Sequence, residues 1–358
     1  MYSYRNPKEP NRRQTLDYRF QLVRDVLTNL HRGECVGVVG VGSCGKSRLL
    51  LHMTRPETME YHLGREAYDH FIALVECNSW LDQTSWGAYE GIARALDDLV
   101  RNANHPRLSA FQNDLAPMYD LVTKERDLAF RHLMTGITYL LEAYPFKLTL
   151  CFDEFDFVFQ NYDAQLFRNL RALRNKSKYQ LTYLVATRRQ MPYQRHIDRQ
   201  EEVEEFYELF TSNTYAIGPY DAKDAQEMVL DLEQRYDYKL KKITRDMLID
   251  VTGGHSGMIG AAFKVLVDSP QPPTTPEQMG QLVVRNASLW KECEKIWDSL
   301  REGEHDALKR LVSGQRPTRE DVVPLQELKA KGLVKTIGER GTMLAFSPIM
   351  QEFARNKA

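Results

Sequence analysis

The sequence predicts an α/β fold: a largely parallel sheet covered by helices, then a helical lid and a small C-terminal winged-helix domain. Three observations carry this prediction. Between residues 15 and 219, short apolar runs of strand length alternate with helix-length segments. From residue 221 to 267 the pattern is helical only. Near the end of the chain, short helices precede two β candidates that are joined by a glycine-containing turn.

Five short apolar segments are expected to be strands. They are residues 35–39, 71–76, 146–152, 181–186 and 214–217. Four segments that repeat apolar residues every three or four positions are expected to be helices. They are residues 15–31, 85–103, 117–143 and 163–174. Strands that alternate with helices form a largely parallel sheet whose two faces are both covered.

A glycine-rich loop follows the first strand. Residues 40–47 read Gly-Val-Gly-Ser-Cys-Gly-Lys-Ser and fit the P-loop pattern G-x-x-x-x-G-K-[ST]. The glycines bring backbone N–H groups against phosphate oxygens, Lys46 supplies charge for the β- and γ-phosphates, and Ser47 offers a hydroxyl to Mg²⁺. The next helix points its positive N-terminus at the anion. The alternative is a glycine turn with an incidental lysine.

The P-loop predicts a set of residues that would contact the phosphates of ATP or ADP. This set comprises Gly40, Gly42, Ser43, Cys44, Gly45, Lys46, Ser47 and Arg48.

Two carboxylates follow the third strand. The apolar run ending at Phe152 continues into Asp153 and Glu154, which is the Walker B pattern. Asp153 would hold the Mg²⁺ shell, and Glu154 is placed to polarise the water that attacks the γ-phosphate. The alternative is a strand that ends in an ordinary polar turn. Together with the P-loop, the pair predicts a sheet in which one additional strand separates the two Walker strands.

Two further positions are candidates for the site. Thr187 and Arg188 end the fourth strand, where Thr187 could orient the water and Arg188 could sense the γ-phosphate. The alternative is a solvated basic junction. Residues 252–258 hold paired glycines and His255, which is either a ligand contact or a helix-start or core histidine.

Composition excludes several classes of protein. The 358 residues carry a formal net charge of −1, which argues against strong non-specific nucleic-acid binding by the whole surface. Five scattered cysteines without C-x-x-C spacing favour buried, reduced thiols in a cytoplasmic protein over a disulfide framework or zinc site. Because no apolar stretch approaches about 18 residues, we expect no membrane segment.

These patterns divide the chain into five expected parts. They are an N-terminal arm at 1–14, the P-loop core at 15–219, a helical lid at 220–270, a linker and connecting helix at 271–302, and a winged-helix domain at 303–358.

Four segments of the sequence resemble the STAND ATPases, the signal-transducing branch of P-loop ATPases related to AAA+ proteins. The segments are residues 36–47, residues 152–156 with 167–173, residues 184–189, and Thr252-Gly253-Gly254-His255. The sequence departs from the family at Ser256, where members often carry proline.

The resemblance implies a minimal switch that binds ATP or ADP with Mg²⁺ and hydrolyses ATP slowly. Its effector or sensor would be a protein on another chain, and its output would be homo-oligomerisation or a partner contact.

Two other functions remain open. One is a DNA-acting ATPase similar to origin-recognition or transposition-regulator proteins. Residues 303–358 carry ten Lys and Arg against seven Asp and Glu, which is only mildly basic and does not favour DNA binding. The other is a nucleotide-binding scaffold without useful catalysis, which the presence of both Walker B carboxylates argues against.

Overall fold

The computed structural model describes residues 14–102, 106–194, 200–284, 286–338 and 341–357, so the arm expected at 1–14 lies almost entirely outside the described residues. Internal contacts divide the chain into two compact units. The first contains Phe20–Val39 and Lys46–Tyr215; the second contains residues 14–19, Gly40–Gly45 and the chain from Ala216 onward. Within the described ranges, every helix is too short or too polar to span a lipid bilayer.

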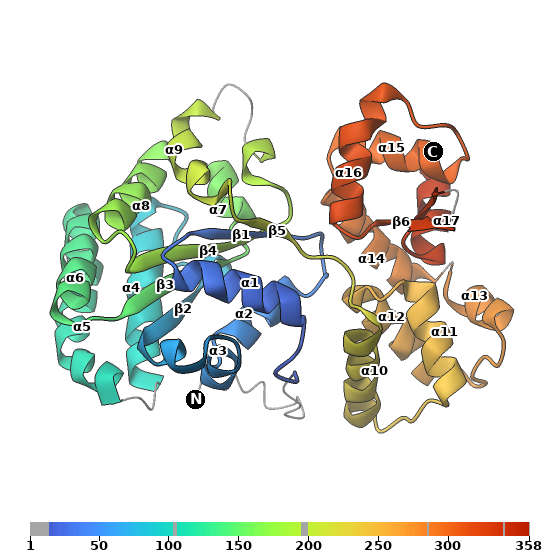
Figure 1. Cartoon of the computed structure of the whole chain (residues 1–358), viewed down its shortest axis with the longest axis horizontal. Helices are drawn as coiled ribbons and strands as arrows, with labels where there is room; N and C mark the ends of the chain where they lie inside the picture. Colours follow the sequence, from blue (N-terminus) through green and yellow to red (C-terminus); the bar gives the residue numbers. More distant parts are fainter. Residues whose placement is uncertain (1–13, 103–105, 195–199, 285, 339–340, 358) are drawn as a thin grey trace. The chain divides into compact units, whose positions relative to one another are not determined.

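A five-stranded sheet forms the centre of the first unit (Figure 1). Its strands are β1 (Val36–Val39), β2 (His70–Glu76), β3 (Lys147–Asp153), β4 (Leu181–Thr187) and β5 (Thr214–Ala216), in the order β2-β3-β4-β1-β5. The β1–β4, β2–β3 and β3–β4 pairs are parallel. β4 lies between β1 and β3, which confirms the additional strand that the sequence predicts.

Nine α-helices surround this sheet in the described part of the first unit. They are α1 (Phe20–His31), α2 (Lys46–Met53), α3 (Pro56–Leu63), α4 (Ser85–Asn102), α5 (Pro106–Lys124), α6 (Ala129–Ala143), α7 (Asp156–Asn161), α8 (Ala164–Lys176) and α9 (Glu204–Tyr207).

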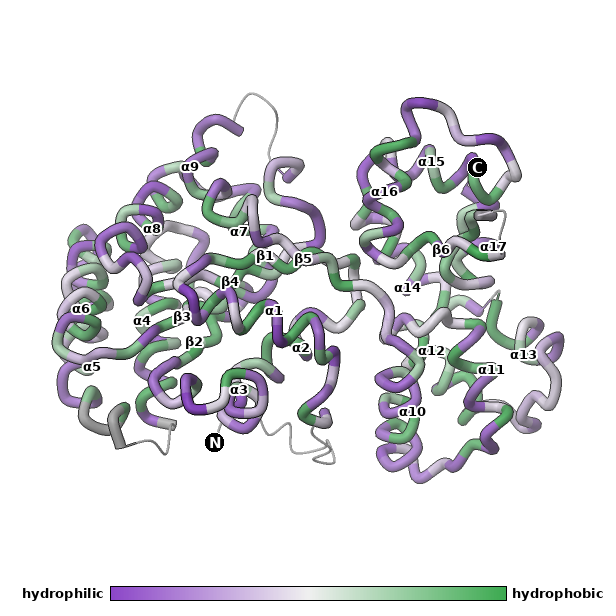
Figure 2. The backbone as a smooth tube through the Cα atoms, viewed as in Figure 1, coloured by the Kyte–Doolittle hydropathy of each residue, from purple (hydrophilic) through white to green (hydrophobic). Residues whose placement is uncertain are grey.

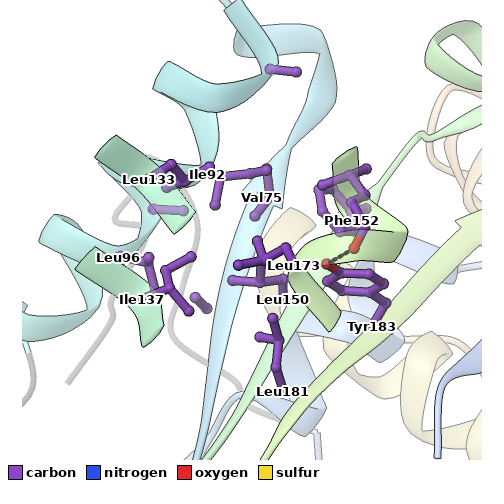
Figure 3. Packing of buried hydrophobic residues seen from close by; sticks show 14 of the residues in the cluster. Val75, Ile92, Leu96, Leu133, Ile137, Leu150, Phe152, Leu173, Leu181 and Tyr183 are labelled. Atoms are coloured by element: carbon purple, nitrogen blue, oxygen red, sulfur yellow. Dashed lines mark hydrogen bonds between the residues drawn. The ribbon is translucent and has the colours of Figure 1, made fainter. Parts of the chain in front are cut away.

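The alternation of side chains along each strand builds the core on both faces of the sheet. One face presents Val75, Leu150 and Tyr183 to helices α4, α6 and α8, as Figure 3 shows. The intervening residues, such as Cys151 and Leu184, are also fully buried. Figure 2 shows the apolar stretch of β1 and, by contrast, the largely hydrophilic surface helix α10. The strands are therefore covered on both sides, as parallel strands require.

One predicted helix differs from the structure. The sequence predicts a single helix over 117–143, whereas α5 begins at Pro106, continues through Pro117 and ends at Lys124. The chain then breaks at Glu125, where φ is −110° and ψ is 71°, before α6 starts. Apolar spacing continues across this break, because both helices bury one face in the same core, so periodicity alone does not reveal it.

The second unit is mainly helical. Its elements are α10 (Ala222–Tyr236), α11 (Lys242–Thr252), α12 (Ser256–Val267), α13 (Pro276–Val283), α14 (Ala287–Asp298), α15 (Glu302–Val312), α16 (Val322–Ala330), β6 (Val334–Ile337), β7 (Thr342–Ala345) and α17 (Pro348–Asn356). Asp221 caps α10 by accepting from the Asp224 N–H. β6 and β7 pair antiparallel. This order, in which helices α15 and α16 precede the hairpin β6–β7, is the order expected of a winged helix.

Candidate functional site

The loop Gly40–Gly45 joins β1 to α2 and adopts the conformation that its residues allow. Gly45 has φ +94°, and Ser43 has φ +57°, a left-handed backbone that few non-glycine residues adopt. α2 then begins at Lys46, with Ser47 exposed in its first turn. The first N–H groups of a helix have no intrahelical partner, so this end of α2 is able to bind an anion.

Contacts within the second unit hold the backbone of the loop. The Ser43 carbonyl accepts from Ser256 Oγ at 2.6 Å and from the Gly257 N–H at 3.1 Å, both at the start of α12. The Gly42 N–H donates to Ser299 Oγ at 3.0 Å. A Cβ on Gly42 would lie 2.9 Å from the Cβ of Lys295. The backbone of the loop is thus fixed by hydrogen bonds and by close packing.

His255 contacts this loop and is fully buried. Its Nδ1 accepts from the Met258 N–H at 3.4 Å, and its Nε2 lies 3.2 Å from the Gly42 carbonyl. Because a carbonyl only accepts, Nε2 carries the proton. The structure therefore places His255 as a cap of α12 and a support of the loop. A direct contact between His255 and a ligand stays a prediction.

Arg19 contacts the loop Gly40–Gly45, and this contact was not predicted from the sequence. Its guanidinium donates to the Gly218 carbonyl at 2.8 Å and to the Cys44 carbonyl at 3.4 Å. It also lies 4.6 Å from the centre of the Tyr220 ring. Its backbone N–H donates to Asp224 Oδ2 at 3.1 Å. A single arginine ahead of α1 carries no sequence pattern that distinguishes it from other surface arginines.

The two Walker B carboxylates stand at the end of β3. The Glu154 N–H donates to Asp153 Oδ1 at 2.9 Å, and Glu154 has φ +55°. The Glu154 side chain is exposed and accepts at Oε2 from the Asn78 amide. Asn78 lies in a 3₁₀ turn (η2, Cys77–Ser79) directly after β2. A polar residue just past the strand beside β3 is the sequence signal that could have identified Asn78.

The strand order shows on which side of β3 this hydrogen bond holds the Glu154 side chain. β2 lies next to β3 on the side away from β4 and β1. β1 is the strand that leads into the loop Gly40–Gly45. The amide of Asn78 therefore holds Glu154 toward the β2 edge, on the side of β3 opposite to β1.

The other predicted residues, Thr187 and Arg188, lie at the carboxyl end of β4. The exposed Arg188 donates its backbone N–H to Asp156 Oδ1 at 2.7 Å. Burial raises the pKa of Asp156, and Lys46 and Arg188 oppose that shift through their positive charge. The buried hydroxyl of Thr187 donates to the Arg189 carbonyl at 2.8 Å. Roles for Thr187 in orienting water and for Arg188 in sensing phosphate stay predictions.

All five cysteines are free and buried, so they form no disulfide. Cys77 and Cys151 lie beneath the carboxylates, and burial raises the pKa of both thiols. Thiols in this state are poor nucleophiles and poor metal ligands.

The donor groups fit a nucleotide with Mg²⁺ better than a protein-held metal. Within the described ranges, no three His, Cys, Asp or Glu side chains gather to hold a metal ion. Ser47 and Asp153 offer a hydroxyl and a carboxylate. Mg²⁺ in phosphate sites takes one or two such oxygens, with water and phosphate as its other ligands.

Among comparisons with known proteins, those with solved structures agree with this fold. No family model matches the sequence, and no curated protein matches it. A solved Walker-type ATPase of Pyrococcus abyssi has a TM-score of 0.57 at 14% identity, over 99% of this chain and 99% of that chain.

The Aeropyrum pernix ORC2 protein, in ADPNP–ADP complexes, has a TM-score of 0.50 at 13% identity, over 94% of this chain and 91% of that chain. Its ADP form has a TM-score of 0.50 at 13% identity, over 98% and 96%. The chain therefore has the P-loop fold of Walker-type ATPases.

Proposed function

We propose that this chain is a slow ATPase that works as a nucleotide-dependent switch of the STAND kind. The observation that carries the proposal is the left-handed loop ending at Gly45, which leads into the N-terminus of α2 with Lys46. Strand β3 of the same sheet, which β4 separates from β1, ends at Asp153, and Glu154 follows it. A phosphate-binding loop with its lysine, a carboxylate for Mg²⁺ and a residue that acts on the attacking water are the recurring parts of enzymes that hydrolyse nucleoside triphosphates.

Each residue has a defined task in this proposal. Lys46 and the loop N–H groups hold the β- and γ-phosphates, and Ser47 and Asp153 hold Mg²⁺. When bound, Mg²⁺ offsets the negative charge that the phosphate oxygens carry. Glu154 accepts a proton from the water that attacks the γ-phosphate, and ADP and phosphate leave as products. Arg188 stabilises or senses the γ-phosphate.

The hydrogen bond from Asn78 supports slow turnover. It occupies one carboxylate oxygen of Glu154. It also holds the side chain toward the β2 edge, so Glu154 must leave Asn78 before it acts on a water near the phosphate. Such a restrained base suits a switch, which must stay in its triphosphate state long enough to signal.

The contacts of the loop suggest how the nucleotide state would be read. Ser256 and His255 at the start of α12 bind the loop carbonyls, and Ser299 binds the Gly42 N–H. A phosphate that changes the loop backbone would alter these bonds and shift residues 220–270, which we assign as a lid. A partner protein on another chain or a second copy of this chain would receive the signal.

DNA binding by the C-terminal region is the second candidate. Supporting it, Arg316, Arg319, Lys329 and Lys335 are exposed around α16 and the hairpin, and the solved ORC2 relatives share the fold. Against it, three other basic residues are paired internally. These pairs are Arg301 with Glu327, Arg310 with Asp321, and Lys331 with Glu304. A gel shift at low ionic strength that disappears as salt is raised would support DNA binding; no shift would remove it.

Calorimetric titration with ATP and Mg²⁺ tests the proposal. The unmodified chain should bind ATP with micromolar or better affinity, and Lys46→Ala should abolish binding because it removes the phosphate-facing charge. Lys176→Ala, at an exposed position at the end of α8, is the matched control and should bind normally. Equal affinity in the Lys46→Ala variant would refute the assignment of the loop.

A further inference from the structure

We propose that Arg94 is a positioning residue for Glu154, which it controls through the turn that carries Asn78. Helices α4 and α5 would then set the rate of ATP hydrolysis. This inference rests on the proposed function, and it adds a site of control about which the P-loop and Walker motifs say nothing.

Arg94 holds the turn at the end of β2. Its guanidinium donates to the Ser79 carbonyl at 2.9 Å and lies 3.3 Å from Ser79 Oγ. Ser79 is the last residue of the turn Cys77–Ser79, and Asn78 is the residue before it. The same short turn therefore carries one hydrogen bond to α4 and another, through the Asn78 amide, to Glu154.

Arg94 is itself fixed by a buried carboxylate. Its Nε lies 3.5 Å from Glu90 Oε1, one helical turn earlier on α4, and the Glu90 side chain is only 2% exposed. The hydroxyl of Tyr119, on α5, donates to the same oxygen at 3.0 Å. A buried carboxylate is costly without partners, so both contacts are strongly favoured. The direction of the Arg94 side chain is thus set by α4 and α5 together.

Packing links the same helix to the turn a second time. A Cβ placed on Gly91 of α4 would overlap the indole ring of Trp80, the residue that follows the turn. The lack of a side chain at Gly91 allows this close approach. A displacement of α4 would therefore move both Ser79 and Trp80, and with them the amide that restrains Glu154.

The consequence for catalysis has a definite sign. Loss of the Arg94 contact frees the turn, weakens the hold of Asn78 on Glu154 and lets the carboxylate reach the attacking water more often. The turnover number should rise, while nucleotide affinity should stay constant because no phosphate-binding group is touched. A partner that pulls α4 away from the turn would have the same effect.

The experiment compares Arg94→Ala with Arg101→Ala. Arg101 lies on the same helix, about two helical turns after Arg94, and also pairs with an acidic residue one turn earlier, Asp97. A second variant, Arg94→Ala with Glu90→Gln, removes the buried charge that the first leaves without its cation. Asn78→Ala, alone and combined with Arg94→Ala, completes a double-mutant cycle. Steady-state hydrolysis gives kcat and KM for each protein, and calorimetry gives the affinity for ATP.

We expect both Arg94 variants to raise kcat by about threefold to tenfold, the size of effect that the loss of one hydrogen bond produces. KM and ATP affinity should stay within about twofold of the unmodified chain. The effect should vanish in the Asn78→Ala background, because both changes release the same restraint. An unchanged kcat in both Arg94 variants, or effects that add fully to those of Asn78→Ala, would overturn the inference.

Hydrogen exchange separates this inference from the proposed function. Arg94→Ala should speed amide exchange in the turn Cys77–Ser79, whereas Arg101→Ala should leave it unchanged. If the unmodified chain has no ATPase activity, the proposed function fails, and faster exchange would still support Arg94 as the residue that holds the turn. Unchanged exchange in Arg94→Ala would refute that role whatever the activity.

Discussion

The phosphate loop and the carboxylate end of β3 are held in opposite ways. The loop is mostly buried, and its backbone contacts Arg19, His255, Ser256 and Ser299. Glu154, by contrast, is exposed, and among the residues that the structure describes the amide of Asn78 restrains its side chain. Several separate segments hold the loop, whereas the described residues provide one hydrogen bond to the side chain of Glu154, the proposed general base.

The difference indicates that the two regions control different quantities. A loop with many supports should tolerate little change, and damage there should lower nucleotide affinity and stability together. A base with one support should be adjustable, so changes around it should alter the rate of hydrolysis and leave affinity alone. The following predictions test this division.

The largest effect is expected from crowding the loop. Gly42→Val would place its side chain against Lys295, 2.9 Å from Cβ to Cβ, and force the loop away from Ser299. We expect loss of ATP binding in a titration and destabilisation by about 1–3 kcal/mol in urea. Gly280→Ala is the control, since nothing lies within 4 Å of its added Cβ. Normal ATP affinity in Gly42→Val would contradict the idea of a tightly held loop.

The next effect concerns the single support of Glu154. Asn78→Ala should raise kcat by about threefold to tenfold, because it releases the carboxylate from the β2 edge. ATP affinity should not change. Asn161→Ala removes a comparable exposed amide, which donates to the Phe157 carbonyl of its own helix, and it should have no effect on either quantity. A fall in kcat in Asn78→Ala would mean that Asn78 orients the base rather than restrains it.

A smaller effect is expected where one of several loop supports is removed. Ser299→Ala leaves the Gly42 N–H without its acceptor in a buried position. We expect a loss of about 1–3 kcal/mol of stability, measured by urea unfolding, with ATP still bound. Ser299→Thr keeps the hydroxyl and should restore most of the loss. Complete loss of ATP binding in Ser299→Ala would show that the other contacts of the loop are not sufficient to hold it in its binding conformation.

The smallest effect is a pH dependence at the Arg19 contact. Burial and the nearby Asp221 raise the pKa of Asp224 to about 6. An unfolded aspartate titrates near 3.9, so the folded state favours the protonated form. Protonated Asp224 therefore stabilises the folded state. This stabilisation is complete below about pH 4 and is lost as the pH rises through 6.

Asp224→Asn keeps an acceptor for the Arg19 N–H and removes the charge. The variant should unfold at a temperature roughly 2–4 °C above the unmodified chain at pH 7, and the difference should disappear near pH 4. Thermal scans of both proteins across this range provide the measurement. A difference that does not change with pH would contradict the raised pKa.

Local patterns in the sequence were sufficient to predict the sheet and to identify the loop that we propose binds phosphate. The apolar runs at 35–39 and 146–152 are confirmed as strands β1 and β3, because strand length and burial on both faces are local properties. The P-loop pattern is also local, because its residues are contiguous in the sequence, and it identifies Lys46 and Ser47 as candidate site residues.

Contacts between distant segments could not be predicted from the sequence. Ser299 meets Gly42 across 257 positions, and Arg19 meets Gly218 across 199, with no motif at either end. His255 was recognised as important, but only the structure shows that its two ring nitrogens bind backbone groups. Asn78 follows a strand that was predicted correctly, and its contact with Glu154 depends on which strands are neighbours.

The most direct test of the account is phosphate release in a single turnover by the Glu154→Gln variant, with ATP binding measured on the same sample. Glutamine keeps the size of the side chain and accepts a hydrogen bond, but it is not a base at neutral pH. We predict normal ATP binding and phosphate release slowed by about a hundredfold or more. Phosphate release at the rate of the unmodified chain would contradict the role of Glu154 and, with it, the proposed ATPase mechanism.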